Sequence, residues 1–180
     1  MTKSCIAFAG AFFLSLGSCW AQSAGNSAIQ AVMADIDAAA PGVKPDPAIS
    51  IKLEKAMSSL SAQMDSGALT QDDLAIAHLY HAKAWYFLFV NDHNFTNADY
   101  DREDARAIRY EFEQAINMML DQSAKTGKDW KKELSEANWQ AGNMVLTIGV
   151  DQFTAYDTFF ANCAALGNPE CKKMMAQAPK

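Results

Sequence analysis

Hydrophobic residues recur at helical spacing along most of the chain, and one stretch, Leu74–Val90, is apolar on every side. When this stretch is wound as an α-helix, one face carries Leu74, His78, His81, Trp85 and Leu88, and an adjacent face carries Ala75, Leu79, Ala82, Tyr86 and Phe89. A helix covered in this way must contact neighbours on most of its sides. The pattern therefore predicts that this helix lies at the centre of the fold.

Amphipathic stripes before and after the central stretch predict further helices. Asp46 with Pro47 and Thr70 with Asp73 are typical helix starts, and Gly67 is a typical helix end. The other apolar stripes fall within 28–40, 49–64, 105–119, 130–148 and 153–163, and a short helix follows the turn at 167–169. No segment alternates between apolar and polar residues like a strand. The sequence therefore predicts an all-α fold of about five to six helices, stacked as antiparallel hairpins.

The first 21 residues have the features of a secretory signal peptide. Lys3 gives a positive start, Ile6–Leu16 is an apolar run too short to span a membrane, and a small-residue site ends at Ala21. We therefore expect cleavage after Ala21 and export, to a bacterial periplasm or to the outside of the cell. An alternative is that Leu16–Cys19 resembles the lipobox of bacterial lipoproteins, which would make Cys19 a lipidated N-terminus.

Length and charge limit the remaining possibilities. A chain of 180 residues, half of them hydrophobic, is enough for one domain. We expect a signal peptide at 1–21, a flexible lead with a short N-terminal helix at 22–46, and a single α-helical domain at 47–177. Loss of Lys3 with the leader leaves 14 basic against 21 acidic residues, so the net charge changes from −6 to −7. This acidic balance disfavours nucleic acid and anionic membranes as partners.

The cysteine count predicts one disulfide. Cys5 and Cys19 fall within the leader, which leaves Cys163 and Cys171 in the mature chain. The turn Gly167–Pro169 between them would bring the following short helix back against Cys163. An even pair in an exported chain is most simply a disulfide.

Two helical segments resemble a known repeat family. His81–Trp85 has small residues beside an aromatic residue, and Tyr110–Ile116 has an aromatic residue and an alanine at a matching spacing. A second unit starts near Glu136, with Gly142 and Gly149 at small-residue positions. This pattern resembles the tetratricopeptide repeat, in which stacked pairs of antiparallel helices form a groove. The stretch 164–170 is similar to the Sel1-type variant of that family.

The resemblance implies a groove that binds another protein or a peptide. Its first helices would present Leu79, Lys83, Tyr86, Trp139, Asn143 and Thr147. In that role, Lys83 would meet a peptide carboxylate and Asn143 would bond a peptide backbone. The alternative is structural: Lys83 extends along apolar neighbours to water, Trp139 fills a gap, and the small residues are those of any antiparallel helical hairpin. On this basis we expect a non-enzymatic adaptor, assembly factor or inhibitor of the immunity type, without a cofactor.

A different class of function would use the loop Asn91–Glu103. Oxygen donors fall at positions one, three, five, seven and twelve of an EF-hand pattern, supplied by Asp92, Asn94, Thr96, the carbonyl of Ala98, and Glu103. Asn97 replaces the turn glycine, and Asp99 stands where an apolar residue is usual. The alternative function is thus a small helical enzyme or a calcium-responsive factor, although Asn and Asp are also ordinary residues of loops.

His78 and His81 lie three residues apart, so they share a helix face and are candidate metal ligands. A third ligand is not identifiable from the sequence. Histidines beside an aromatic residue such as Trp85 are more often hydrogen-bonded residues of a core. The sequence therefore favours a structural role for this pair.

Overall fold

The computed structural model describes residues 27–40, 45–92, 102–148 and 152–178, and these residues are almost entirely helical. An N-terminal helix covers 27–38. It is followed by α2 (Pro47–Asp65), α3 (Gln71–Asp92), α4 (Arg102–Thr126), α5 (Lys131–Ile148), α6 (Gln152–Thr154), a π-helical segment η1 (Ala155–Phe160), α7 (Ala161–Ala165) and α8 (Pro169–Ala176). The described residues contain no strand, so the predicted all-α fold class is confirmed.

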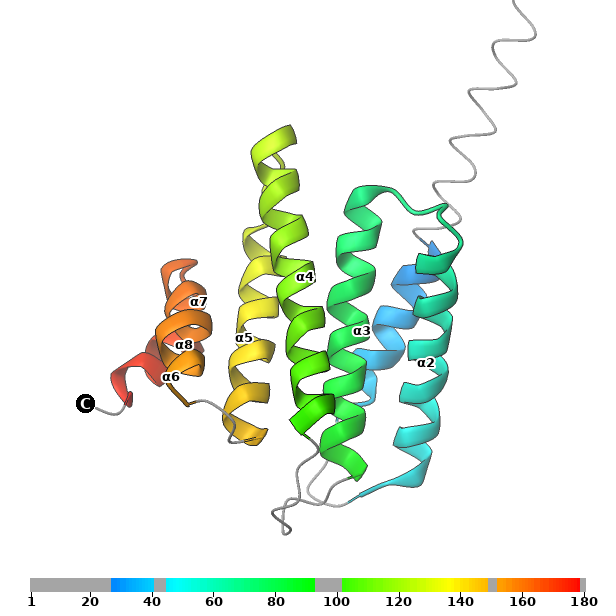
Figure 1. Ribbon diagram of the computed structural model, residues 1–180, viewed down its shortest axis with the longest axis horizontal. Helices are drawn as coiled ribbons and strands as arrows, with labels where there is room; N and C mark the ends of the chain where they lie inside the picture. The colour runs from blue at the N-terminus through cyan, green and yellow to red at the C-terminus, as the bar shows by residue number, and fades with distance from the viewer. Residues whose placement is uncertain (1–26, 41–44, 93–101, 149–151, 179–180) are drawn as a thin grey trace, which may run out of the picture.

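Helices that follow one another in the chain lie side by side in space. In Figure 1, α2, α3, α4 and α5 stand in this order across the molecule, with the segment from α6 to α8 beside α5. The N-terminal helix, drawn in blue, lies behind α2 and α3 in this view. Ile36 of this helix and Ala39, which follows its end, belong to the same hydrophobic core as the other helices. The result is a row of neighbouring helices joined by one continuous core.

Local capping chemistry sets where several helices begin. Asp46 accepts a hydrogen bond from the backbone N–H of Ala48, with Pro47 in the first turn of α2. At the start of α3, the Thr70 hydroxyl donates to Asp73 over 2.8 Å and accepts from the Asp73 backbone N–H over 3.1 Å. Both predicted helix starts are therefore present.

Helix α3 is the most thoroughly buried element, as its apolar sequence predicts. Ala82 and Ala84 point to different sides of the helix and are both fully buried. The helix packs against α2 on one side and α4 on the other. Its buried residues include His81, Lys83 and Asn91, which are polar. These three side chains must be hydrogen-bonded within the fold or remain costly to bury.

The loop predicted to start at Asn91 begins later, because α3 continues to Asp92. The Asn91 amide accepts from the backbone N–H of Asp46 over 3.1 Å and donates to the Asp46 carbonyl over 3.0 Å. It also donates to the Ser50 hydroxyl over 2.7 Å. Asn91 therefore joins the end of α3 to the start of α2, a long-range bond that its loop-forming tendency does not reveal.

Cys163 and Cys171 form the predicted disulfide, which joins α7 to α8. Gly167 adopts a φ of 96° at the turn between the two helices, a conformation that favours glycine. Asn168 follows and caps α8 by accepting from the backbone N–H groups of Glu170 and Cys171. The short final helix is thus fixed by a cap and a covalent bond.

Reduction of this disulfide should lower the free energy of unfolding by about 2.5 kcal/mol, because the bond closes a short loop in the unfolded chain. The bridged residues are eight apart in sequence. Thermal unfolding with and without a reductant measures the loss, and a Cys163→Ser/Cys171→Ser variant is the control for reductant effects. An unchanged melting temperature under full reduction would contradict the expectation.

The predicted signal peptide and the lipobox at Cys19 lie outside the described residues, as does Gly149. Among the helices that are described, none has both the length and the apolar character needed to cross a membrane.

Candidate functional site

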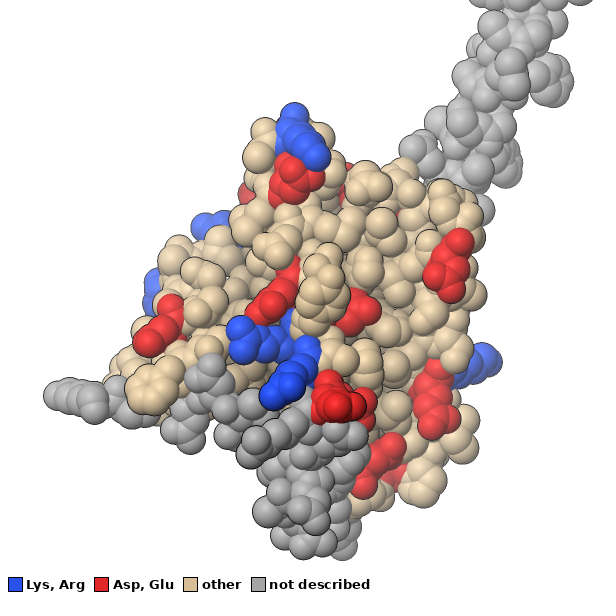
Figure 2. Space-filling model, in the orientation of Figure 1, with Lys and Arg blue, Asp and Glu red and all other residues tan. Residues whose placement is uncertain are grey.

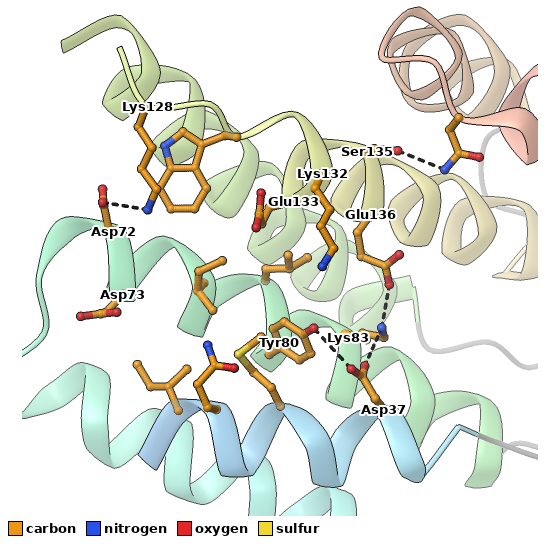
Figure 3. A pocket seen from close by; sticks show the side chains of 17 residues that line it. Asp37, Asp72, Asp73, Tyr80, Lys83, Lys128, Lys132, Glu133, Ser135 and Glu136 are labelled. Carbon is orange, nitrogen blue, oxygen red and sulfur yellow. Dashed lines mark hydrogen bonds and ion pairs between the residues drawn. The ribbon is translucent and has the colours of Figure 1, made fainter. Parts of the chain in front are cut away.

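A pocket of about 680 Å³ lies between the N-terminal helix, α3 and α5 (Figure 3). These helices alternate with α2 and α4 along the chain, so the pocket is lined by every second helix. Its lining residues are Ile29, Gln30, Met33, Asp37, Asp72, Asp73, Ile76, Leu79, Tyr80, Lys83, Lys128, Trp130, Lys132, Glu133, Ser135, Glu136 and Asn168. The volume is in the range of small-ligand sites, about 300–1,000 Å³.

Lys83 joins the three helices at one end of the pocket. Its Nζ donates to Asp37 Oδ1 over 2.9 Å and to Glu136 Oε1 over 2.6 Å (Figure 3). The Lys83 side chain is only 9% exposed, whereas those of Asp37 and Glu136 are 51% and 35% exposed. The buried ammonium is therefore held by two carboxylates that water still reaches.

The surroundings of Lys83 keep it charged. Burial by itself lowers the pKa of Lys83, but the hydrogen bonds and charges of Glu136 and Asp37 outweigh burial and raise that pKa above its ordinary value. Burial also raises the pKa of the Tyr80 phenol, and the charge of Asp37 adds to this effect. The Lys83 Nζ lies 5.4 Å from the centre of the Tyr80 ring. At this end of the pocket, the polar groups are held in place by their contacts with one another.

The other end of the pocket holds a second lysine in a looser arrangement. Lys128 Nζ lies 2.9 Å from Asp72 Oδ2 and 3.7 Å from the centre of the Trp130 ring. The Lys128 side chain is 43% exposed, while Trp130 is 2% exposed. Lys128 comes from the short connection between α4 and α5 (Figure 3). Its ammonium therefore covers the face of a buried indole beside a carboxylate.

Acidic groups prevail over basic groups in the pocket. Its lining carboxylates outnumber its lysines five to three. On the face of the molecule shown in Figure 2, acidic and basic side chains are interspersed among uncharged ones. The pocket combines this acidic excess with four apolar lining residues, of which Met33 and Ile76 are partly exposed and Ile29 and Leu79 are buried.

The six residues that the sequence assigns to a groove have three different placements. Leu79 and Lys83 line the pocket. Tyr86 and Thr147 hydrogen-bond to each other over 3.2 Å, which links α3 directly to α5. Trp139 packs against Phe160 with ring centres 5.8 Å apart, and Asn143 donates to the Trp139 carbonyl over 2.8 Å. A groove role for all six stays a prediction, and the pocket brings together only the first two.

The predicted calcium loop lies mostly outside the described residues, which include neither Asn94 nor Thr96 nor Ala98. Its first and last positions belong to helices, with Asp92 at the end of α3 and Glu103 in the first turn of α4. Asp92 accepts a hydrogen bond from the Ser50 hydroxyl over 2.6 Å. Calcium binding by this loop stays a prediction.

His78 and His81 form a second polar cluster with Glu111 of α4. His78 Nδ1 lies 2.7 Å from Glu111 Oε2, whereas His81 Nδ1 lies 3.7 Å from Glu111 Oε1, too far for a hydrogen bond. His81 Nε2 lies 3.2 Å from the Ser61 hydroxyl of α2. Across the described part of the chain, no group of three or more His, Cys, Asp or Glu side chains is arranged to hold a metal ion. The cluster links α2, α3 and α4 through polar contacts.

Stability should fall in mildly acidic solution because of His81. Burial lowers the pKa of His81 below its ordinary value of 6.5, the charge of Glu111 opposes this effect, and His78 adds to it. The unfolded chain then binds a proton at His81 before the folded protein does, so stability is full above about pH 6.5 and falls as the pH drops through the lowered pKa. Melting temperatures between about pH 7.5 and pH 5 should show this slope, and a His81→Gln variant should lack it. A His78→Gln variant retains His81 and is the control. An equal slope in wild type and His81→Gln would contradict the assignment.

The sequence pattern predicts only that Trp130 lies on the apolar face of a helix, and it predicts no role for Lys128 or Asp72. The sequence does contain a signal for the contact between Lys128 and Trp130, because the two residues are two apart and directly follow Gly127, which ends a helix. Asp72 is 56 residues away from Lys128 in sequence, so only the fold places it beside them.

The chain was compared with protein-family models, with curated proteins and with solved structures. None of the three comparisons gave a match.

Proposed function

We propose that the protein is an exported, non-enzymatic module that binds another protein, through a peptide segment, in the pocket between the N-terminal helix, α3 and α5. The observation that carries this proposal is a pocket of about 680 Å³ lined by alternate helices of the chain. In stacked helical hairpins, the first helices of successive pairs face one common surface, so a segment placed there meets several helices at once. The proposed location outside the cytoplasm rests on the predicted signal peptide.

The chemistry of the pocket supports a peptide segment as its occupant. Met33 and Ile76, which are partly exposed, supply apolar surface above the buried Ile29 and Leu79, and polar side chains such as Gln30 and Ser135 also line the pocket. Sites for ligands and peptides commonly combine an apolar lining with a few polar groups that fix orientation. The bonds from Lys83 to Asp37 and Glu136 hold the helices in place, so little ordering of the pocket is needed when a ligand binds.

A peptide library displayed against the immobilised mature protein tests the proposal. Enriched peptides should bind the wild type and should bind a Gln30→Trp variant at least about tenfold more weakly, because Gln30 is an exposed pocket residue and an indole there narrows the pocket. The matched control is Glu54→Trp, at an exposed position of α2 that does not line this pocket.

Two results would refute the proposal. One is that the library yields no peptide that binds the wild type. The other is that Gln30→Trp and Glu54→Trp bind the enriched peptides equally well, which would place binding elsewhere on the protein. Melting temperatures of both variants show whether either substitution disturbs the fold.

A further inference from the structure

We infer that Lys128 occupies, within its own chain, a cation site formed by Asp72 and Trp130, and that a lysine or arginine side chain of the bound segment takes its place. This inference rests on the proposed peptide-binding role of the pocket and names the chemistry of the ligand. It commits to a peptide segment in which a basic residue adjoins an apolar one.

The site has the two groups that bind an organic cation. A carboxylate attracts the charge, and the face of an indole ring attracts it through the ring quadrupole. Asp72 Oδ2 lies 2.9 Å from the Lys128 ammonium, and the Trp130 ring centre lies 3.7 Å from it. All three residues line the same pocket, and Figure 3 shows Lys128 and Asp72 facing each other at its edge. The protein itself therefore displays the contact that a basic ligand would make.

The position of Lys128 in the chain allows its side chain to move away from Asp72 and Trp130. It follows Gly127, which ends α4 with a φ of 71°, and it precedes α5, which begins at Lys131. Its side chain is 43% exposed, and the Asp72 side chain is 39% exposed. Exposed ion pairs of this kind are weak, and rotation of the Lys128 side chain leaves both helices intact. By contrast, the Lys83 side chain at the opposite end is 9% exposed and pairs with carboxylates of two other helices, so a ligand cannot readily displace it.

Charge complementarity indicates what replaces Lys128. When the Lys128 ammonium turns away, the pocket lining around it keeps three carboxylates, those of Asp72, Asp73 and Glu133, against one ammonium, that of Lys132. A ligand cation then restores the balance, and guanidinium fits well because it stacks on aromatic faces and pairs with carboxylates. The partly exposed side chains of Ile76 on α3 and Met33 on the N-terminal helix would contact the neighbouring apolar side chain of the ligand.

The test measures binding of three capped pentapeptides with a central Arg, Gln or Glu between two leucines. Affinities come from isothermal titration at low salt, and the indole N–H resonance of Trp130, assigned with a Trp130→Phe variant, reports on the site. The Arg peptide should bind about three- to tenfold more tightly than the Gln peptide, and the Glu peptide should bind most weakly.

Two variants test displacement directly. Lys128→Gln removes the internal competitor, so it should raise the affinity for the Arg peptide about three- to tenfold and leave the affinity for the Gln peptide within about twofold. Asp72→Asn should lower the affinity for the Arg peptide by a similar factor. The matched control is Lys125→Gln, which breaks the exposed pair with Asp121 and does not line the pocket.

The outcomes separate this inference from the proposed function. If the Arg and Gln peptides bind equally, or if Lys128→Gln fails to raise affinity for the Arg peptide, the cation site is refuted, while binding that Gln30→Trp weakens would still support the pocket. If none of the three peptides binds and the displayed library also yields nothing, both proposals fail.

Discussion

Phe160→Ala should lower the free energy of unfolding by about 4 kcal/mol, the largest loss expected from a single substitution considered for this chain. Phe160 is fully buried within the π-helical segment η1. Its ring centre lies 5.8 Å from that of Trp139 on α5 and 5.5 Å from that of Tyr156. Removal of the ring leaves a cavity between α5 and the C-terminal helices, and the loss of ring contacts adds to the lost burial. Urea denaturation followed by circular dichroism measures the change.

The control for Phe160 is a surface phenylalanine of α6, which directly precedes η1. Phe153 is 77% exposed, so Phe153→Ala should change stability by no more than about 0.5 kcal/mol. Equal losses from the two variants would show that the C-terminal helices are not packed on α5 as described.

The close approach of Phe160 to Gly142 gives a second check on the same packing. A Cβ atom built on Gly142 would lie 2.7 Å from Cε1 of Phe160 and 2.9 Å from its Cδ1. Gly142→Ala should therefore cost stability, although alanine favours helix formation more than glycine. In a Phe160→Leu background the cost should shrink, because the smaller side chain makes room, and a double-mutant cycle measures the coupling.

The parts of the fold that depend on neighbours in the sequence were predictable. Thr70 and Asp73 are three residues apart, so a short sequence motif is enough to predict that they cap the start of α3 together. The same holds for the turn that brings Cys171 back to Cys163. The burial of α3 followed from a composition that leaves no polar face for water.

The parts of the site that depend on distant residues were not predictable. Lys83 stood out as the only charge of the central stretch, and two roles were open for it, a groove contact or an extension to water. Its partners Asp37 and Glu136 are 46 and 53 residues away, on helices whose register against α3 no local pattern defines. Two roles were likewise open for Trp139, a groove contact or the filling of a gap, and its contact with Phe160 depends on the path of the C-terminal helices. A conspicuous residue can thus be identified from sequence before its partner can.

Lys83→Ala should lower the free energy of unfolding by about 3 kcal/mol. The substitution removes the ammonium that bonds Asp37 and Glu136, and it also removes the buried aliphatic stem. Loss of one member of a buried ion pair typically costs about 3–5 kcal/mol. The value expected here is at the lower end, since Asp37 and Glu136 are partly exposed and water can solvate them once Lys83 is gone.

Lys83→Met separates charge from packing, because methionine retains most of the stem, and it should cost about half as much as Lys83→Ala. Lys52→Ala, at an exposed position of α2, is the control for loss of a surface lysine and should be nearly neutral. The difference in the free energy of unfolding between wild type and Lys83→Met should also decrease at high pH. The pKa of Lys83 is raised above 10.5 in the folded protein, so the contribution of its charge is complete below that value and is lost as the pH rises through the raised pKa. If Lys83→Ala instead changed stability by less than about 0.5 kcal/mol, the ammonium would not hold the three helices together, and Lys83 would be free to meet a ligand.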